Sequence, residues 1–263
     1  MTKLTENIKL IYNHTIHHNA QLKFATHCHN SYEIIFFIKG NANYLIEDRK
    51  YILKKYDLII TKPTQYHNVE IVSNDDYERY DILIENCKVI EEMLDGLDKQ
   101  CEVINCSNMP TIIDNFKKMD EYEKKFAQED FTELLYLLLV EIMYNIKIYD
   151  ANPSQDYNLA SPLIQKALAY INENLFTIQN VSDVSDYLFV AKNYFFKLFK
   201  EQMKVPPKKY INNKRLLQAQ RMIANGEKPT GVFDKCGFSN YVSFYKRYVD
   251  FFGYPPSQEE KRY

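Results

Sequence analysis

Hydrophobic and polar residues alternate along the first third of the chain in short stretches, with polar turns between them. These stretches are rich in β-branched and aromatic residues, and they lie at residues 33–38, 42–47, 51–53, 58–61, 67–72 and 80–85. Turn-forming residues such as Gly40 and Pro63 stand between them. Short strands at this close spacing are typical of a small sandwich or barrel. The alternating pattern over residues 22–85 therefore predicts a β-barrel-like domain.

The apolar period changes to that of a helix from about Thr111. One helix is predicted there, because Ile112, Phe116 and Met119 recur at helical spacing. A second helix is predicted over residues 130–149. Its broad apolar face consists of Leu134, Leu135, Leu138, Leu139, Ile142, Met143 and Ile146. Since a face of this width can serve two partners, we expect the helix to pack in its own domain and to contribute to a homodimer.

A polar segment at residues 150–156, which contains Pro153, is predicted to link two domains. We place the first domain at residues 1–152 and the second at residues 157–263. The second domain is helical almost throughout, and the pattern of helix, turn and helix occurs twice in it, around residues 181–201 and 232–248. The expected fold is therefore α+β with two domains, an N-terminal β-barrel with flanking helices and an all-α C-terminal domain with two helix-turn-helix units.

Charge is divided unequally between these domains, although the whole chain of 263 residues has a net charge of only −2. Residues 157–263 hold 16 Lys and Arg against 9 Asp and Glu, whereas residues 1–156 hold 17 against 26. The acidic first part and the basic second part indicate that only the second meets a polyanion. A solvated basic face would give the same count, so charge alone does not identify the partner.

Several classes of protein are disfavoured by the composition. No apolar run approaches the roughly 20 residues of a membrane span, and the N-terminus lacks the features of a signal peptide, so we expect a cytoplasmic protein with no membrane partner. The five cysteines are scattered and are expected to be buried reduced thiols. We find no Ser, His and Asp arrangement, no phosphate-binding glycine loop and no paired carboxylates. We therefore predict no catalytic residues and no enzyme activity.

A series of motifs runs through the C-terminal domain. In chain order, they are Tyr194-Phe195-x-Lys197-Leu198-Phe199-Lys200, Tyr210-Ile211, Arg215-Leu216-x-x-Ala219, Cys236-Gly237-Phe238-Ser239-Asn240, Phe244-x-Lys246 and Gly253-Tyr254-Pro255-Pro256-Ser257. With these motifs, about a hundred residues resemble the DNA-binding domain of the arabinose-regulator (AraC/XylS) family. This resemblance implies two recognition helices that enter successive major grooves about one DNA turn apart. Double-stranded DNA is therefore the expected partner, with RNA polymerase as a further one.

The resemblance also implies which residues contact DNA. The base-contacting positions of the family correspond to Asn193, Phe196, Lys197, Ser243 and Lys246. Lys197 and Lys246 are expected to donate to guanine O6 and N7, and Phe196 to touch a thymine methyl group. Phosphates are the expected partners of Lys192, Lys200 and Arg247, and Tyr245 is a further candidate on the second recognition helix. A solvated helix face is the alternative interpretation of each lysine.

Departures from the family pattern fall in the second helix-turn-helix unit. Phe233 stands where a small Ala is usual, and Asp250 replaces a usual basic residue near the phosphates. Pro229 and Gly231 stand where helix formers are expected. Because Gly in a helix interior costs about 1 kcal/mol relative to Ala, we expect this unit to be irregular and to contribute less to DNA recognition.

Histidines mark the N-terminal domain. The sequence His27-x-His29-x-x-x-Glu33, followed by the distant His67, resembles the metal-ligand pattern of cupin barrels. Alternation on a strand would put His27 and His29 on one face, and such side chains can hold iron, manganese, zinc or nickel. The second cupin motif is imperfect, however, because Tyr56 and Gln65 stand where its glycines are expected.

We therefore expect a cupin-like sensor domain in which His27, His29, Glu33 and His67 contact a small-molecule effector, such as a sugar or a related metabolite. No metal or other cofactor is predicted. The separate cluster of His14, His17 and His18 is expected to face solvent.

Together these features favour a sequence-specific DNA-binding transcription regulator whose N-terminal domain senses a small molecule. Two alternatives stay open at this point. The first is a metal-dependent cupin enzyme with a DNA-binding tail, which tightly bound metal and turnover would favour. The second is a protein-interaction module, which salt-sensitive DNA binding without sequence preference would favour.

Overall fold

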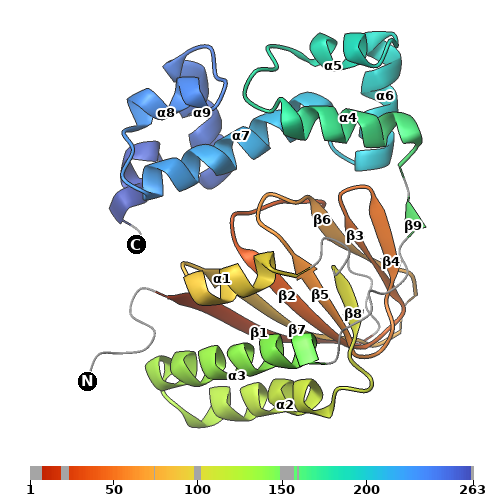
Figure 1. Cartoon of the computed structure of the whole chain (residues 1–263), viewed down its shortest axis with the longest axis vertical. Helices are drawn as coiled ribbons and strands as arrows, with labels where there is room; N and C mark the ends of the chain where they lie inside the picture. The colour runs from red at the N-terminus through yellow and green to blue at the C-terminus, as the bar shows by residue number, and fades with distance from the viewer. Residues whose placement is uncertain are drawn as a thin grey trace. The chain divides into compact units, whose positions relative to one another are not determined.

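The computed structural model describes residues 8–18, 24–73, 75–97, 102–148, 157–158 and 160–261. They form two domains whose main boundary lies between Tyr157 and Asn158, and the expected linker at residues 150–156 lies outside the described residues. The N-terminal domain contains strands β1 (Lys9–His17), β2 (Tyr32–Lys39), β3 (Ala42–Ile46), β4 (Arg49–Ile52), β5 (Asp57–Thr61), β6 (His67–Ile71), β7 (Tyr77–Glu85) and β8 (Val103–Asn105), and helices α1 (Lys88–Asp95), α2 (Pro110–Lys125) and α3 (Gln128–Ile148) (Figure 1). Strand β9 (Tyr157–Asn158) lies at the boundary.

Antiparallel sheets form the body of the N-terminal domain. In the described part of the chain, the larger sheet has the strand order β1-β7-β2-β5-β8, and the smaller one places β3 between β6 and β4. Pairing of β3 with β6 puts Ile46 opposite His67, and pairing of β2 with β5 puts Glu33 opposite Thr61. The six predicted strands correspond to β2 through β7. The sequence did not predict β1, β8 or α1.

Strand β2 is buried on both faces, which explains why its sequence is apolar at nearly every position. Ile34 and Phe36 pack in one core with residues of α2 and α3, whereas Ile35 and Phe37 pack in another with residues of the smaller sheet. Because successive side chains on a strand point to opposite faces, Glu33 shares the second face with Ile35 and Phe37. The strand thus places a carboxylate between the two sheets, where Glu33 is 6% exposed.

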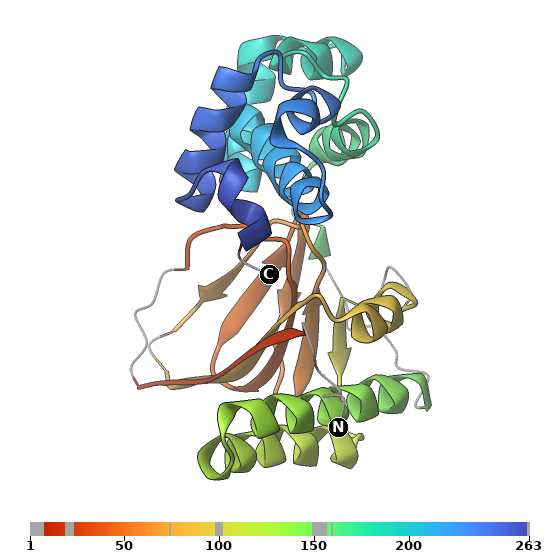
Figure 2. The same ribbon diagram turned by 90° about the vertical axis from the view of Figure 1, so that its left-hand side faces the viewer.

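Helices α2 and α3 lie side by side against the larger sheet (Figures 1 and 2). Leu138 and Leu139 of α3, which the sequence assigned to a face shared by core and dimer, are buried within their own domain. The prediction that these two leucines also contact a second copy of the chain is therefore wrong.

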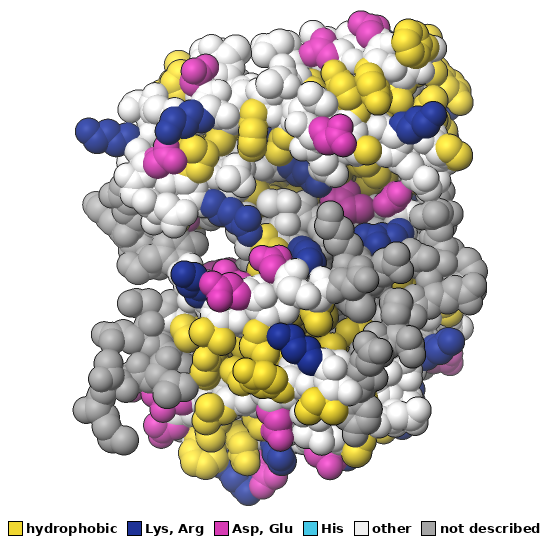
Figure 3. Space-filling model, in the orientation of Figure 1, with side chains coloured by type: hydrophobic (Ala, Val, Ile, Leu, Met, Phe, Trp, Pro, Cys, Tyr) yellow, Lys and Arg dark blue, Asp and Glu magenta, His cyan; other side chains and the backbone are white. Residues whose placement is uncertain are grey.

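A different face of α3 carries exposed apolar side chains. Leu137, Tyr144 and Ile148 on this helix are exposed, as is Val89 on α1. Figure 3 shows hydrophobic side chains gathered over α1 and α3.

Among the described residues, no helix is long and apolar enough to cross a membrane.

The first strand is tied to the helices by a histidine that the sequence predicted to face solvent. His14 Nε2 lies 3.0 Å from Oε1 of Glu78, and His14 Nδ1 lies 3.0 Å from Oδ1 of Asp120 on α2. Its ring stacks on Tyr80 with centroids 4.2 Å apart. The expectation is therefore wrong for His14, which joins β1 to β7 and α2.

Buried thiols agree with the prediction from cysteine spacing. Cys87, Cys106 and Cys236 are buried, and burial raises the pKa of the Cys106 thiol to about 12. Cys101 lies outside the described residues.

The C-terminal domain contains helices α4 (Pro162–Glu173), α5 (Val181–Tyr187), α6 (Lys192–Met203), α7 (Pro207–Ala224), α8 (Pro229–Lys235) and α9 (Tyr241–Phe252), and the 3₁₀ helix η1 (Pro256–Lys261). Figure 1 shows α7 running from the group of α4, α5 and α6 to the group of α8 and α9. Leu216, Ala219 and Ile223 of α7 share a core with Phe244 and Tyr248 of α9. The expected α+β fold, with a β-rich first domain and an all-helical second domain, is confirmed.

The second helix-turn-helix unit is regular, contrary to our expectation. Pro229 lies in the first turn of α8, where its missing N–H breaks no helix hydrogen bond. A Cβ atom added at Gly231 would have no heavy atom within 4 Å. Phe233 packs edge to face against Tyr241, with ring centroids 5.9 Å apart. The departures at Pro229, Gly231 and Phe233 are therefore accommodated in the continuous helix α8.

We expect Leu139→Ala to lower the free energy of unfolding by about 2–5 kcal/mol, because it leaves a cavity in a close-packed core. The exposed Lys147→Ala on the same helix leaves no cavity and should change stability by no more than about 0.5 kcal/mol. Urea unfolding followed by circular dichroism at one protein concentration compares the two. Equal losses in both variants would contradict the assignment of the faces of α3.

Candidate functional site

Helix α6 separates apolar and polar side chains onto opposite faces. Phe195 and Phe199, four residues apart, are buried, and their rings meet edge to face with centroids 5.5 Å apart. The predicted DNA-contacting residues of this helix are all exposed, and they are Lys192, Asn193, Phe196, Lys197 and Lys200. The exposed face of α6 therefore combines cationic, amide and aromatic groups.

Helix α9 repeats this arrangement in the second unit. Phe244 and Tyr248 are buried, whereas Tyr245 and Lys246 are exposed. Ser243 and Arg247 are half-buried, and Arg247 Nε donates to Ser243 Oγ at 3.4 Å. All four predicted residues of α9 thus have side chains that reach the surface at least in part.

Both units start helices with polar side chains that hold the turns in place. At α5, the side chain of Asn180 accepts from the backbone N–H of Ser182, and Asp183 accepts from the backbone N–H of Asn180. This capping box satisfies N–H groups that have no partner within the helix. At α9, the side chain of Asn240 accepts from the backbone N–H of Ser243 at 2.8 Å. The first turn of α9 is therefore fixed beside its candidate DNA-contacting residues.

A buried arginine joins the two helix-turn-helix units. Arg215, on α7, is 5% exposed. Its Nε donates to the carbonyl oxygen of Leu175 at 2.7 Å, and its Nη2 donates to that of Ile178 at 2.5 Å. These residues precede α5, whereas Nη1 donates at 2.8 Å to the carbonyl oxygen of Gly237, between α8 and α9. One guanidinium therefore bonds to the entry of the first unit and to the turn of the second.

Gly237 is required where these segments meet. Its φ is +75°, which L side chains rarely adopt. A Cβ atom at this position would lie 2.5 Å from the carbonyl oxygen of Phe176 and 2.9 Å from Cζ of Arg215. The glycine therefore allows the turn of the second unit to approach both the first unit and the arginine.

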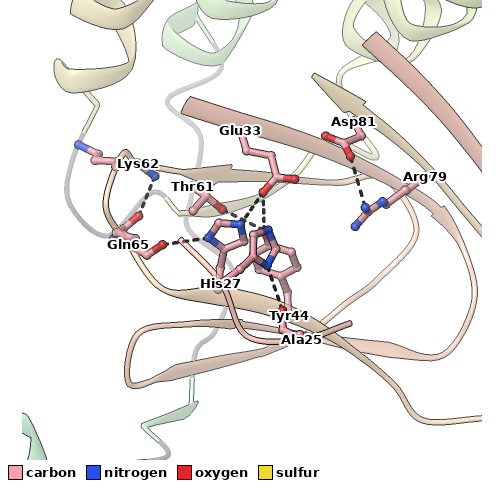
Figure 4. A network of polar contacts seen from close by, with 10 residues as sticks. Ala25, His27, Glu33, Tyr44, Thr61, Lys62, Gln65, Arg79 and Asp81 are labelled. Atoms are coloured by element: carbon pink, nitrogen blue, oxygen red, sulfur yellow. Dashed lines mark hydrogen bonds and ion pairs between the residues drawn. The ribbon is translucent and has the colours of Figure 1, made fainter. Parts of the chain in front are cut away.

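In the N-terminal domain, polar side chains converge between the two sheets. Glu33 Oε2 lies 3.0 Å from Nε2 of His67, and it accepts from the hydroxyl of Tyr44 at 3.1 Å. The Tyr44 hydroxyl oxygen also lies 3.0 Å from Oγ1 of Thr61. Figure 4 shows Glu33, Tyr44 and Thr61 pointing toward one another. Burial and then the charge of Glu33 raise the pKa of Tyr44 well above its ordinary value, so the phenol keeps its proton.

The predicted ligand-contacting histidines meet in the same region. A ligand atom from each of His27, His29 and His67 lies within 4.8 Å of the others. His27 is exposed, His29 half-buried and His67 buried, so the cluster extends from the surface to the interior. His27 and His67 also form an isolated β-bridge, which holds their backbones together. The structure therefore brings together all four of the predicted residues, including Glu33.

Other polar residues of the interior were missed by the sequence analysis. Arg79 and Asp81 lie beside the Glu33 cluster in Figure 4, with Nη2 and Oδ2 3.3 Å apart. Burial acts to lower the pKa of Arg79, but Tyr77, Asp81 and Glu33 raise it overall. Strand alternation was the available signal, because Tyr77, Arg79 and Asp81 alternate with Tyr80 and Ile82 of the helix-side core.

Two family models match the chain, in the order of its two domains. A model described as an AraC-like ligand binding domain matches residues 14–136. A model described as a helix-turn-helix domain matches residues 184–262.

Relatives and a solved structure match the chain to different extents. The probable transcriptional regulator LumQ of Photobacterium leiognathi is 36% identical over 90 residues, which are 34% of this chain and only 36% of that protein. The uncharacterized HTH-type transcriptional regulator YbfI of Bacillus subtilis is 22% identical over 224 residues, with 83% of this chain and 80% of that protein covered. A crystal structure of ToxT from Vibrio cholerae is 15% identical, with 95% of this chain and 96% of that chain covered and a TM-score of 0.38.

We expect Arg215→Lys to lower the free energy of unfolding by about 2–4 kcal/mol. The substitution keeps the charge, but an ammonium group on a flexible stem does not reproduce the planar fork that reaches three carbonyl groups. Urea unfolding measures the effect, with the exposed Lys209→Ala on the same helix as a control that should match the wild type. A stability equal to that of the wild type would show that the arginine does not hold the two units together.

Proposed function

The chain belongs to the AraC-type family of transcriptional regulators, in which a ligand-binding domain accompanies a helix-turn-helix DNA-binding domain, and on this premise we propose how it recognises DNA and its effector. It is a regulator of transcription and not an enzyme. In our proposal, α6 and α9 enter successive major grooves of one promoter, and a small molecule bound between the sheets of the N-terminal domain changes how strongly they bind. The exposed polar faces of α6 and α9 carry this proposal.

Within these helices we assign different roles to different residues. Bases are contacted by Asn193, Phe196, Lys197, Ser243 and Lys246. Phosphates are contacted by Lys192, Lys200 and Arg247, with Tyr245 as a further contact. The amide and the ammonium groups can recognise base edges by hydrogen bonds, whereas contacts to phosphates position the protein without sequence information. The regular helix α8 supports a full part for the second unit.

The effector in this proposal is a small hydroxylated molecule, such as a sugar or a related metabolite, that contacts His27, His29, Glu33 and His67. Support comes from the convergence of these side chains, with Tyr44 and Thr61, at a place that is open to solvent at His27. Polar groups that converge within an apolar interior are what orients a ligand in such sites. The apolar residues around them belong to the core between the sheets.

In this proposal the two domains have different functions. Residues 1–152 sense the effector and form a homodimer, and residues 157–263 bind double-stranded DNA in the cytoplasm. RNA polymerase is a further proposed partner. The exposed side chains of Leu137, Tyr144 and Ile148 on α3 support the dimer, since a second copy would cover them.

We expect Lys197→Ala to weaken binding to the preferred DNA sequence by about 5- to 150-fold, because a base contact of this kind contributes about 1–3 kcal/mol of discrimination. Its binding to scrambled DNA should change much less. Sites are first selected from a random DNA pool by the full chain, and fluorescence anisotropy then measures affinity for the selected and the scrambled DNA over a salt series.

Lys200→Ala is the matched comparison on the same helix. Loss of a phosphate contact should weaken binding to both DNAs alike and reduce the salt slope by about 1. Lys117→Ala removes an exposed charge from α2 and should leave both affinities unchanged. If the pool yields no preferred sequence while salt-sensitive binding persists, the protein is an interaction module and the proposal fails.

We expect the double substitution Leu137→Glu and Tyr144→Glu to give a folded monomer, because it places charges on the apolar face of α3. Analytical ultracentrifugation measures the mass, and circular dichroism measures the helix content. Ile52→Glu, at an exposed position of β4, is the control and should stay dimeric. An unchanged dimer in the double variant would exclude this face as the interface.

A further inference from the structure

The helices α6 and α9 can be aligned with each other by their buried aromatic residues. Phe195 and Phe199 are buried in α6. Phe244 and Tyr248, at the same spacing, are buried in α9. Each helix begins three residues before the first of its two aromatic residues. Equivalent positions in the two helices therefore have the same relation to the core and to the exposed face.

This alignment identifies the residues of α9 that correspond to the DNA-contacting residues proposed for α6. Lys246 corresponds to Lys197, and both are exposed. The counterpart of Asn193, however, is Val242 and not the neighbouring Ser243. Asn193 is exposed, and Val242 is 63% exposed. The position that carries an amide group in the first unit therefore carries two methyl groups in the second.

The first turn of α9 holds Val242 in a defined place. The side chain of Asn240 accepts from the backbone N–H of Ser243 at 2.8 Å, so the turn is fixed on both sides of the valine. A valine in a helix has one strongly preferred side-chain rotamer. Its methyl groups are thus oriented before any contact forms, and little conformational freedom is lost when they make one.

Val242 is also the side chain of this turn that is best placed to reach a base. Among residues 241–244 it alone is exposed. Ser243 is half-buried, and its Oγ already accepts from Nε of Arg247 at 3.4 Å. Side chains near the start of a recognition helix are the ones that contact base edges in the major groove.

The chemistry of valine limits what it can recognise. Single exposed apolar residues are common on protein surfaces, so the role of Val242 follows from its position and not from its exposure. An isopropyl group neither donates nor accepts a hydrogen bond. In the major groove, the base feature that such a group can distinguish by apolar contact is the C5 methyl group of thymine.

We propose that Val242 recognises a thymine methyl group in the DNA bound by α9, in addition to the base contacts assigned above. This inference rests on the proposed function, because it requires α9 to lie in a major groove. Lys246 follows Val242 by one turn on the same exposed face, and its positive charge is complementary to the DNA.

The two half-sites therefore differ at equivalent positions. The amide of Asn193 can pair with N6 and N7 of adenine by hydrogen bonds, whereas Val242 selects thymine by contact with its methyl group. The preferred DNA is accordingly not a direct repeat of one half-site, although the two helix-turn-helix units resemble each other.

Replacement of thymine by deoxyuridine tests this contact, because it removes the C5 methyl group and leaves base pairing intact. The full chain first selects its preferred sequence from a random DNA pool, and each thymine of that sequence is then replaced in turn. We expect replacement at one thymine in the half-site of α9 to weaken binding by the wild type about 3- to 5-fold, the effect of losing one buried methyl-sized group. Fluorescence anisotropy measures the affinities.

The same replacement should not affect binding by Val242→Ala, which lacks the two methyl groups that make the contact. Asn193→Ala, at the equivalent position of α6, is the matched control and should keep the full loss at that thymine. Both substitutions are at exposed positions, and circular dichroism checks that the helix content is unchanged.

The possible failures can be told apart. If the pool yields no preferred sequence, the proposed function and the role of Val242 are both overturned. If a preferred sequence is found but no thymine responds to replacement, only the role of Val242 is overturned. The same holds if every response of the wild type persists unchanged in Val242→Ala.

Discussion

The guanidinium of Arg215 connects segments that are distant in the sequence but must be adjacent for the C-terminal domain to work. It donates to carbonyl groups before α5 and to one between α8 and α9. The cost of removing it exceeds the value of the bonds themselves, because the buried carbonyl groups would lose their partner. The close approach that it permits also excludes any side chain at Gly237. The geometry between the two helix-turn-helix units, and hence between α6 and α9, depends on this side chain together with the packing of α7.

In the N-terminal domain a corresponding constraint acts through β2. One face of this strand packs in the core with α2 and α3, and the other carries Glu33 into the interior between the sheets. A slip of one residue in its register would exchange the two faces. Glu33 would then be buried among apolar side chains, and Ile34 would take its place beside His67. The same apolar contacts that stabilise the helices therefore keep the carboxylate next to the histidines.

Much of this was accessible from the sequence, and the failures have physical causes. The repeated pattern of helix, turn and helix predicted α6 and α9, because amphipathic helices record their burial in the spacing of apolar residues. Periodicity did not predict β1, whose polar His14 is satisfied by Glu78 and Asp120, partners that only the folded chain brings near. It assigned Leu138 and Leu139 to a face shared by the core and a dimer. In the structure both leucines are buried, whereas the neighbouring Leu137 is exposed. The spacing of His27, His29 and Glu33 indicated a ligand site, but the role of Tyr44 depends on strand pairing.

The hydrogen bonds of Arg215 to both helix-turn-helix units also affect which DNA the protein can bind. If α6 and α9 are the recognition helices, as we propose, and are held at a fixed separation, the protein cannot adjust itself to half-sites that are slightly too close or too far apart. The difference must be taken up by bending or twisting the duplex, at an energy that depends on the stiffness of the base steps in between. Base pairs that no side chain touches would then influence affinity through their flexibility. The arginine would thus extend the specificity of the protein to the spacer.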